Sequence, residues 1–513
     1  MRFDLTKYFN MNRRDFIRTS CAAMGSTTLL STLTSLKSLN GAINPIAYNN
    51  AAITDYKAIV CILLSGGMDS YNMLVPTGVT PGADNGFNEY KALRTDLAFS
   101  SAASLLSLNN PQCSGFRGLA CPYGSFGVHP QMSGVRDLFN SGKLAFMANI
   151  GTLVEPLANY NEYRGGVKKI PLGIYSHSDQ QMQWQTSVPQ SRSAVGFGGR
   201  MADLLNASNA HQEISMNISL AGKNTFQRGE EISEYTISSN ISPTNVGFNS
   251  VPTWWGNSGL LNDLRDAAVD SLVSKTYANL LQKTYSSTTK SSVDSFAIFK
   301  EALQKVPSMN TVFANNSLSN NLAAIAKVMS VRNFLGAKRQ IFFVDFGGWD
   351  MHSDLVTGLN TRLPIVSQAM KAFYDATVEL GIADKVTTYT ISDFARTITS
   401  NGLGADHAWG GNTMVMGGAV NGGKIYGAFP KMDVLTNPQN ISFRGNFIPS
   451  VSTDELYAEL ALWYGVSPAD LCYVLPNLGN FYSYSAGNYP LGLMNFSGTN
   501  ISTDDKPQGC LTY

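Results

Sequence analysis

The chain is 513 residues long, and a single core stops growing near about 250–300 residues, so either two domains or one large domain with insertions fits this length. Hydrophobic residues make up 44% of the chain, which allows a large packed core. The formal net charge is +1 and only 14% of the residues are charged, which excludes the strongly basic surface typical of nucleic-acid-binding proteins.

The N-terminal residues carry an export signal. The segment MNRRDFIR contains Arg13 and Arg14 and leads into CAAMGSTTLLSTLTSL, a mildly apolar stretch of small residues. This order predicts a twin-arginine signal peptide over residues 1–47, cleaved after Ala42 or Ala47. A permanent anchor is the alternative, but the stretch is rich in Ser and Thr and shorter than the ~20 apolar residues that a span needs. We therefore expect export by the twin-arginine translocase, a periplasmic or secreted location, and no transmembrane span in the mature chain.

Apolar runs alternate with helical patterns through residues 48–513. The runs predict strands buried on both faces, at 57–64, 143–151, 214–222, 339–348 and 385–394. Helices are predicted at 130–142, 319–336, 363–381 and 452–465, and Ser452 and Glu455 have capping-box spacing at the start of the last one. This alternation predicts an α/β fold with a mostly parallel sheet. Residues 225–310, which are polar and partly helical in pattern, are expected to form an insertion or cap.

Cys21 lies in the predicted signal peptide, and five further cysteines follow it in the chain. An oxidising compartment permits disulfides, and Cys113 and Cys121 flank a short loop that contains glycine, which makes them the best candidates for a pair. Cys472 with Cys510 is the second candidate. The remaining cysteine lies within the first predicted strand, in KAIVCILL, and is expected to be a free, buried thiol.

Acidic residues and histidines lie close to the ends of the predicted strands. In an open α/β sheet, ligands collect at the carboxyl ends of the strands. The residues that could meet there are Asp69, Ser176, His177, Asp350, His352, Asp393, Asp406 and His407. Three of the five histidines in the chain have an aspartate within two residues. Aspartate oxygen and neutral histidine nitrogen are ordinary ligands of Zn, Mn, Mg or Ca, so this pattern predicts a divalent metal site.

Two features of this region have simpler alternatives. Each Asp–His pair, taken singly, is often a loop cap or a buried, hydrogen-bonded histidine, although the repetition after successive strands favours one shared site. Arg396 follows the fifth predicted strand, where its guanidinium could bind a phosphate or sulfate oxygen. A salt bridge from Arg396 to a neighbouring carboxylate is the alternative.

Several segments together resemble a known bacterial family. They include LLSGGMDSYNMLVP, SHSDQQMQW, GGWDMH, SDFARTITSNGLGADHAWGG and MGGAVNGGKIYGAFP, in order from about residue 57 to past residue 430. On these segments the chain is identified as a member of the family called domain of unknown function 1501, in which twin-arginine signals are usual. The family is similar to the alkaline phosphatase and sulfatase superfamily. The resemblance implies an α/β sandwich with a central, mostly parallel sheet and helices on both faces, and a metal-dependent hydrolase ancestry.

The resemblance also implies roles for individual residues. The implied metal ligands are Asp69, Asp350, His352, Asp406 and His407. Ser176 would be the nucleophile, activated by a metal that lowers the pKa of its hydroxyl, and His177 a ligand or an acid. The chain departs from the family pattern at Ala408 and Trp409, where the family has Gly and His. One imidazole is therefore missing. One or two divalent ions are expected, and the loss of this ligand favours one ion, or none, over two.

Two functions are compatible with these observations. The first is an exported metal-dependent hydrolase that cleaves phosphate or sulfate esters of a small molecule or a polymer. The second is a non-catalytic cell-envelope or secreted protein that keeps the hydrolase fold. The retained Asp and His pairs favour the first function, and the missing imidazole at Trp409 favours the second.

Overall fold

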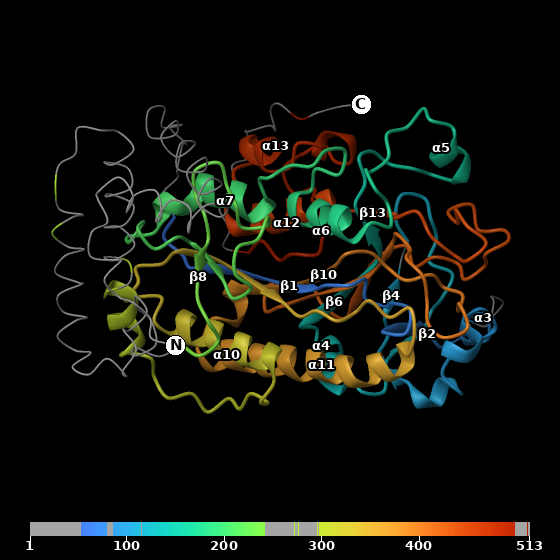
Figure 1. The fold of residues 1–513 in the computed structure, drawn as a ribbon, viewed down its shortest axis with the longest axis horizontal. Coiled ribbons are helices and arrows are strands. Elements are labelled where there is room, and N and C mark those ends of the chain that lie inside the picture. Colours follow the sequence, from blue (N-terminus) through green and yellow to red (C-terminus); the bar gives the residue numbers. More distant parts are fainter. Residues whose placement is uncertain are drawn as a thin grey trace, which may run out of the picture.

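The structure is a computed structural model that describes residues 53–78, 86–113, 115–241 and 297–497, together with four single residues: 271, 275, 295 and 510. The predicted signal peptide lies outside the described residues, as does most of the predicted insertion. The described part consists of a wide sheet between two layers of helices (Figure 1).

One large sheet runs through the centre of the described residues. Its strands have the order β4-β12-β6-β11-β10-β1-β9-β7-β8, and β13 pairs with β6. Every described pairing in this sheet is parallel except the two made by β11. The strands are β1 Lys57–Leu64, β4 Gln112–Cys113, β6 Leu144–Gly151, β7 Asn217–Ser219, β8 Tyr235–Thr236, β9 Arg339–Asp345, β10 Val386–Ser392, β11 Gly411–Gly417, β12 Lys424–Gly427 and β13 Val451–Ser452. A second, smaller sheet contains β2 Leu74–Pro76, β5 Phe126–Val128 and β3 Leu106–Ser107.

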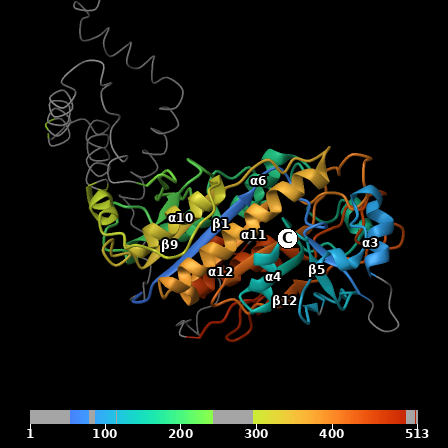
Figure 2. The same cartoon turned by 90° about the horizontal axis from the view of Figure 1, so that it is seen from below.

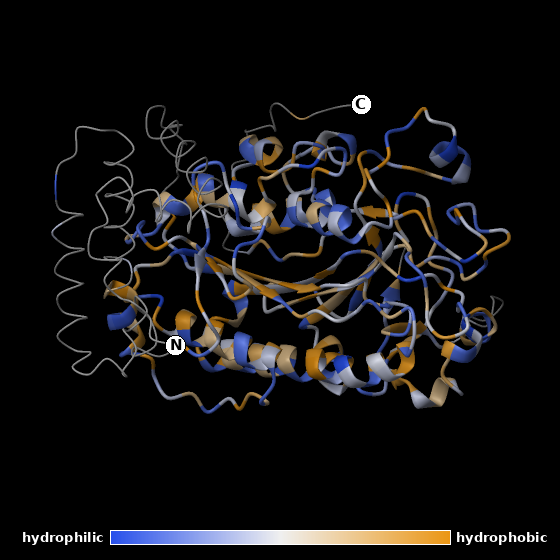
Figure 3. Ribbon diagram, viewed as in Figure 1, coloured by the Kyte–Doolittle hydropathy of each residue, from blue (hydrophilic) through white to orange (hydrophobic). Residues whose placement is uncertain are grey.

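Strand β1 illustrates why the centre of the sheet is apolar. All eight of its residues are buried, and it pairs with β9 on one side and with β10 on the other. Its side chains alternate between two cores, with Ile62 and Leu64 in one and Cys61 and Leu63 in the other. Because neither face meets water, the strand is a continuous apolar run, and Figure 3 shows the hydrophobic colour along the central strands.

Helices cover both faces of the sheet (Figures 1 and 2). One layer contains α4 Ser133–Asn140, α10 Ser317–Ser330 and α11 Leu355–Glu379. The other contains α6 His177–Thr186, α7 Phe197–Leu205, α12 Thr453–Tyr464 and α13 Leu471–Val474, while α3 Gly86–Arg94 and α5 Tyr160–Arg164 lie toward one end of the molecule. Every residue of α12 is buried, and the predicted capping box between Ser452 and Glu455 starts this helix.

The predicted α/β fold, with a mostly parallel sheet and helices on both faces, is confirmed. The five predicted strands correspond to β1, β6, β7, β9 and β10, and the four predicted helices to α4, α10, α11 and α12. The sequence analysis missed the other elements, among them the seven-residue strand β11 and the helices α3, α6 and α7. Helix α6 has the sequence HSDQQMQWQT, which lacks an apolar stripe, so only its packing against the sheet and its capping serine indicate a helix.

The described edges of the predicted 225–310 insertion lie against the main sheet. Phe226 and Gln227 are fully buried, and β8 extends the sheet beyond β7. Phe299 and Ala302 are fully buried as well. Both ends of this stretch therefore contribute to the main core.

The cysteine predictions are confirmed. Disulfides join Cys113 to Cys121 and Cys472 to Cys510, and Cys61 is free and buried. None of the helices within the described residues has the length and apolarity needed to cross a bilayer.

Candidate metal site

The candidate site lies where the parallel strands β1, β9 and β10 end. Their carboxyl ends share one edge because the three strands are parallel neighbours. The loop after β9 carries Asp350, the loop after β10 carries His407, and the first residue of α6 is His177. Residues more than 170 positions apart in the chain are thereby brought to one place.

A glycine turn after β1 allows the loops to approach closely. Gly66 has φ +122°, and a Cβ on it would lie 2.5 Å from the backbone nitrogen of Asp350, so no other residue fits. Arg396 then ties the loops together. Its fully buried guanidinium donates to the carbonyl oxygens of Gly66 and Gly67, among others, and to Asp350 Oδ1 at 2.6 Å.

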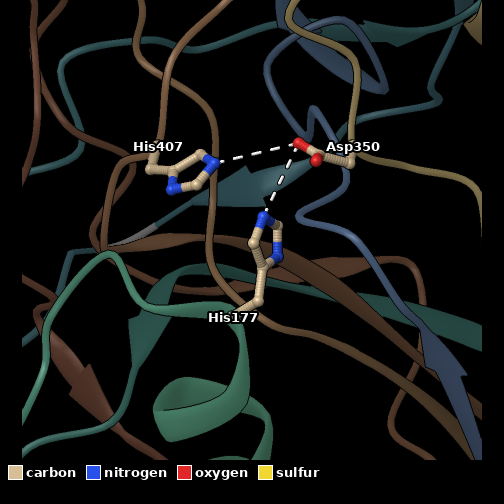
Figure 4. Close-up of side chains that lie close together, drawn as sticks. All are labelled: His177, Asp350 and His407. Carbon is tan, nitrogen blue, oxygen red and sulfur yellow. Dashed lines mark ion pairs between the residues drawn. The ribbon is translucent and has the colours of Figure 1, made fainter.

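Three side chains converge on one small volume. His177 Nε2 lies 3.6 Å from Asp350 Oδ1, and His407 Nε2 lies 3.8 Å from the same oxygen (Figure 4). One ligand atom of each of the three residues lies within 4.8 Å of the other two. His352 completes the surroundings, because its Nδ1 is 2.9 Å from Asp350 Oδ1 and its ring lies 4.7 Å from that of His407.

The far nitrogen of each of the two imidazoles is held by the protein. His177 Nδ1 is 2.6 Å from Asp393 Oδ2, and His407 Nδ1 is 2.7 Å from the carbonyl oxygen of Tyr175. Tyr175 has φ +77°, a strained conformation for a non-glycine residue, which places its carbonyl at this position. An acceptor at Nδ1 leaves the lone pair on Nε2, so both lone pairs face the carboxylate of Asp350.

Those two Nε2 atoms are buried and make no hydrogen bond among the described residues. At 3.6 and 3.8 Å from Asp350 Oδ1, they are too far away for hydrogen bonds to it. Buried polar atoms without partners are costly, so they point to a missing partner. Two ligands that each lie about 2.1 Å from a tetrahedral ion are roughly 3.4 Å apart, close to the spacing seen here.

Burial and neighbouring charges shift the pKa values of Asp350 and His407 toward the forms that bind a cation. Burial raises the pKa of Asp350, but the hydrogen bond and charge of Arg396 outweigh this effect, and the pKa is lowered overall. Burial lowers the pKa of His407. The hydrogen bond that its ring donates to the carbonyl oxygen of Tyr175 opposes this shift, and the positive charge of Arg396 adds to it. An ionised aspartate and a neutral imidazole are the forms that bind metals. The side chain of Asp350 is 51% exposed, which leaves one side of the cluster open.

The structure does not bring Asp69 to this cluster. Asp69 is buried and forms an ion pair with Arg94, which is also buried, and it accepts a hydrogen bond from the backbone nitrogen of Tyr71. A guanidinium therefore takes the place beside Asp69 that the resemblance gives to a metal.

Asp406 also has other partners. Its Oδ2 lies 2.9 Å from Arg444 Nη1, and its Oδ1 accepts from Asn401 Nδ2 at 3.0 Å. Only its neighbour His407 belongs to the cluster.

The side chains of Ser176 and Arg396 already have partners in the structure. The hydroxyl of Ser176 caps α6 by accepting from Asp179 N at 3.4 Å and lies 3.3 Å from Ser178 Oγ. Arg396 matches the salt-bridge alternative, since its donors go to backbone carbonyls and Asp350 and it has no exposed surface for an oxyanion.

Two contributing residues were not assigned a role from the sequence. In the sequence, Asp393 is distinguished only as a carboxylate that follows a predicted strand. Tyr175 could not be identified from its residue type, because only its backbone carbonyl contacts His407. The position of Asp393 directly after a buried strand was the available indication.

Together, the fold and the cluster define an α/β protein with two imidazoles and one carboxylate gathered at the ends of parallel strands. The chain belongs to the family described as "Protein of unknown function (DUF1501)", whose model matches residues 56–444. The family prediction is thereby confirmed. A comparison with curated proteins finds no match.

Solved structures give distant matches. One is the lipoteichoic acid synthase LtaP from Listeria monocytogenes, with 8% identity, a TM-score of 0.30 and coverage of 80% of each chain. Another is Ps i-CgsB, with 9% identity and a TM-score of 0.30 over 88% of this chain and 75% of that chain. Structural similarity at this level does not establish a shared fold or function. The α/β arrangement of this chain is established by its own strands and helices.

Proposed function

We propose that the protein is an exported, metal-dependent hydrolase of phosphate or sulfate esters, with one divalent ion bound by His177, Asp350 and His407. The observation that carries the proposal is the pair of buried, unpartnered Nε2 atoms that face one carboxylate. Three protein ligands with an open fourth position are typical of catalytic rather than structural zinc sites. Zn, Mn, Mg or Ca remain candidates for the ion, and the resemblance of the sequence motifs to the alkaline phosphatase and sulfatase superfamily favours the ester class.

A single ion is proposed rather than two. The other carboxylates that could hold a second ion, Asp69 and Asp406, are neutralised by Arg94 and Arg444. The side chain at 409 is a buried tryptophan, so it offers no imidazole. Arg396 supplies a fixed positive charge beside the proposed ion.

The chain's own residues would share the chemistry. A divalent ion held here would supply Lewis-acid polarisation of an ester oxygen. His352, whose side chain is 47% exposed beside Asp350, would give a proton to the leaving alcohol. Ser176, directly before His177, is the proposed nucleophile, and it would have to give up its long contact with the nitrogen of Asp179 to attack.

The second candidate function is a non-catalytic envelope or secreted protein. It is favoured by Arg396, which already pairs with the oxygen of Asp350 that faces both imidazoles. It is also favoured by Ser176, which serves as a helix cap.

Metal analysis of the purified, exported protein, followed by hydrolysis assays with p-nitrophenyl phosphate and p-nitrophenyl sulfate, tests the proposal. We expect one divalent ion per chain, loss of that ion in His407→Ala, and ester cleavage that chelation abolishes and added metal restores. A folded wild-type protein that binds no divalent ion would refute the metal site. A protein that binds the ion but cleaves neither ester supports the second candidate.

A further inference from the structure

We infer that Asp393 is a positioning residue that sets the tautomer of His177, so that Nε2 is the nitrogen offered to the proposed ion. This inference rests on the proposed metal site, but it concerns a property of the protein without metal. Asp393 follows β10 directly and has no exposed surface.

The carboxylate of Asp393 is surrounded by donors. The backbone nitrogen of Gly66 donates to Oδ1 at 3.0 Å, and Gln181 Nε2 donates to Oδ2 at 2.9 Å. His177 Nδ1 lies 2.6 Å from Oδ2. A carboxylate only accepts, so the proton of the imidazole must be on Nδ1 and the lone pair on Nε2. That Nε2 is the buried, unpartnered atom 3.6 Å from Asp350.

The two imidazoles of the cluster are supported unequally. His407 Nδ1 faces a neutral carbonyl oxygen, that of Tyr175, whereas His177 Nδ1 faces a carboxylate. A carboxylate behind a histidine fixes the orientation of the ring and makes the histidine a more basic ligand. Asp393 therefore gives His177 a charged partner, where His407 has a neutral one.

The substitution Asp393→Asn would reverse the tautomer. The amide group has the same shape as the carboxylate, but the N–H of Gly66 requires the amide oxygen to take the Oδ1 position. The amide NH₂ then takes the Oδ2 position and donates to His177 Nδ1. The imidazole proton moves to Nε2, which removes the lone pair that the ion needs. Gln181 can accommodate the change because its own amide can flip to present its oxygen.

The test uses metal-free protein labelled with ¹⁵N-histidine, at about pH 8, where an ordinary histidine is neutral. We expect the His177 signals, assigned by comparison with His177→Gln, to show the Nδ1–H tautomer in the wild type and the Nε2–H tautomer in Asp393→Asn. Isothermal titration with Zn²⁺ should show affinity about 10–100-fold weaker in Asp393→Asn.

Asp345→Asn is the matched control. Asp345 ends strand β9, which is separated from β10 by β1, and its carboxylate accepts from Ser65 Oγ at 2.6 Å rather than from an imidazole. The same loss of negative charge there should leave the tautomer of His177 unchanged and the Zn²⁺ affinity within about threefold of wild type.

Two outcomes would overturn the inference. One is an Nε2–H tautomer of His177 in the wild-type protein, a result that needs no variant to fold. The other is an equal loss of Zn²⁺ affinity in Asp393→Asn and Asp345→Asn, which would indicate a general effect of charge. If the wild type binds no Zn²⁺ but shows the Nδ1–H tautomer, the proposed function fails while the positioning role stands.

Discussion

Replacing Asp69 by Ala is expected to weaken the fold and to leave the ion site intact. The side chains of Asp69 and Arg94 are 1% and 0% exposed, and within the described residues Asp69 is the only carboxylate that pairs with Arg94. The substitution leaves a guanidinium in the interior without a counter-charge, and the N–H of Tyr71 loses its acceptor as well.

The expected magnitude follows from this burial. Breaking a buried ion pair by removal of one partner costs about 3–5 kcal/mol in the free energy of unfolding, because the remaining charge stays desolvated. The double variant Asp69→Leu/Arg94→Met should recover part of that loss, since no charge is then buried alone. Recovery should be incomplete, because the carbonyl oxygens of Thr397 and Ile398 lose the donor that Arg94 provides.

Urea unfolding followed by circular dichroism gives the free energies, and Zn²⁺ titration of the folded proteins gives the affinities. We expect a large loss of stability in Asp69→Ala, with a Zn²⁺ affinity within about threefold of wild type. An Asp69→Ala protein with unchanged stability and no Zn²⁺ binding would refute it, and would assign Asp69 the ligand role that the family resemblance implies.

Three further predictions concern other residues. His407→Ala should abolish stoichiometric ion binding. It should change the free energy of unfolding by less than about 1 kcal/mol, because a half-buried ring is removed together with an unpartnered nitrogen. Retained ion binding, measured by metal analysis, would contradict the site. Ser176→Ala should lose about 1 kcal/mol from the lost cap and all ester hydrolysis, with ion stoichiometry kept, and full activity would exclude the serine as nucleophile. Burial raises the pKa of Glu459 from 4.5 to about 7, so the folded state binds the proton more tightly than the unfolded state. The stability that this group contributes is therefore present below about pH 4.5 and is lost as the pH rises to about 7. Glu459→Gln should therefore lose less stability over that interval than the wild type, and parallel curves of unfolding free energy against pH would contradict the assignment.

Local patterns in the chain were sufficient to predict much of the framework. The run KAIVCILL predicted a strand covered on both faces, and Ser452 with Glu455 predicted the start of α12. The loop between Cys113 and Cys121 is short enough for its ends to meet, so spacing alone identified the pair. Such features depend on neighbours within a few residues, which is why they are visible without a structure.

The tertiary structure decided which acidic and histidine side chains meet. His177 and Asp393 are 216 positions apart, and Asp69 and Arg94 are held together by packing that the local sequence does not encode. Whether an aspartate serves as a ligand or as an ion-pair partner depends on a few ångströms of placement, and that placement comes from the register of β1, β9 and β10 and from the seating of α6 on the sheet. The sequence alone therefore determined the candidate groups and the layers, while the packing of distant segments selected three of those groups for one site.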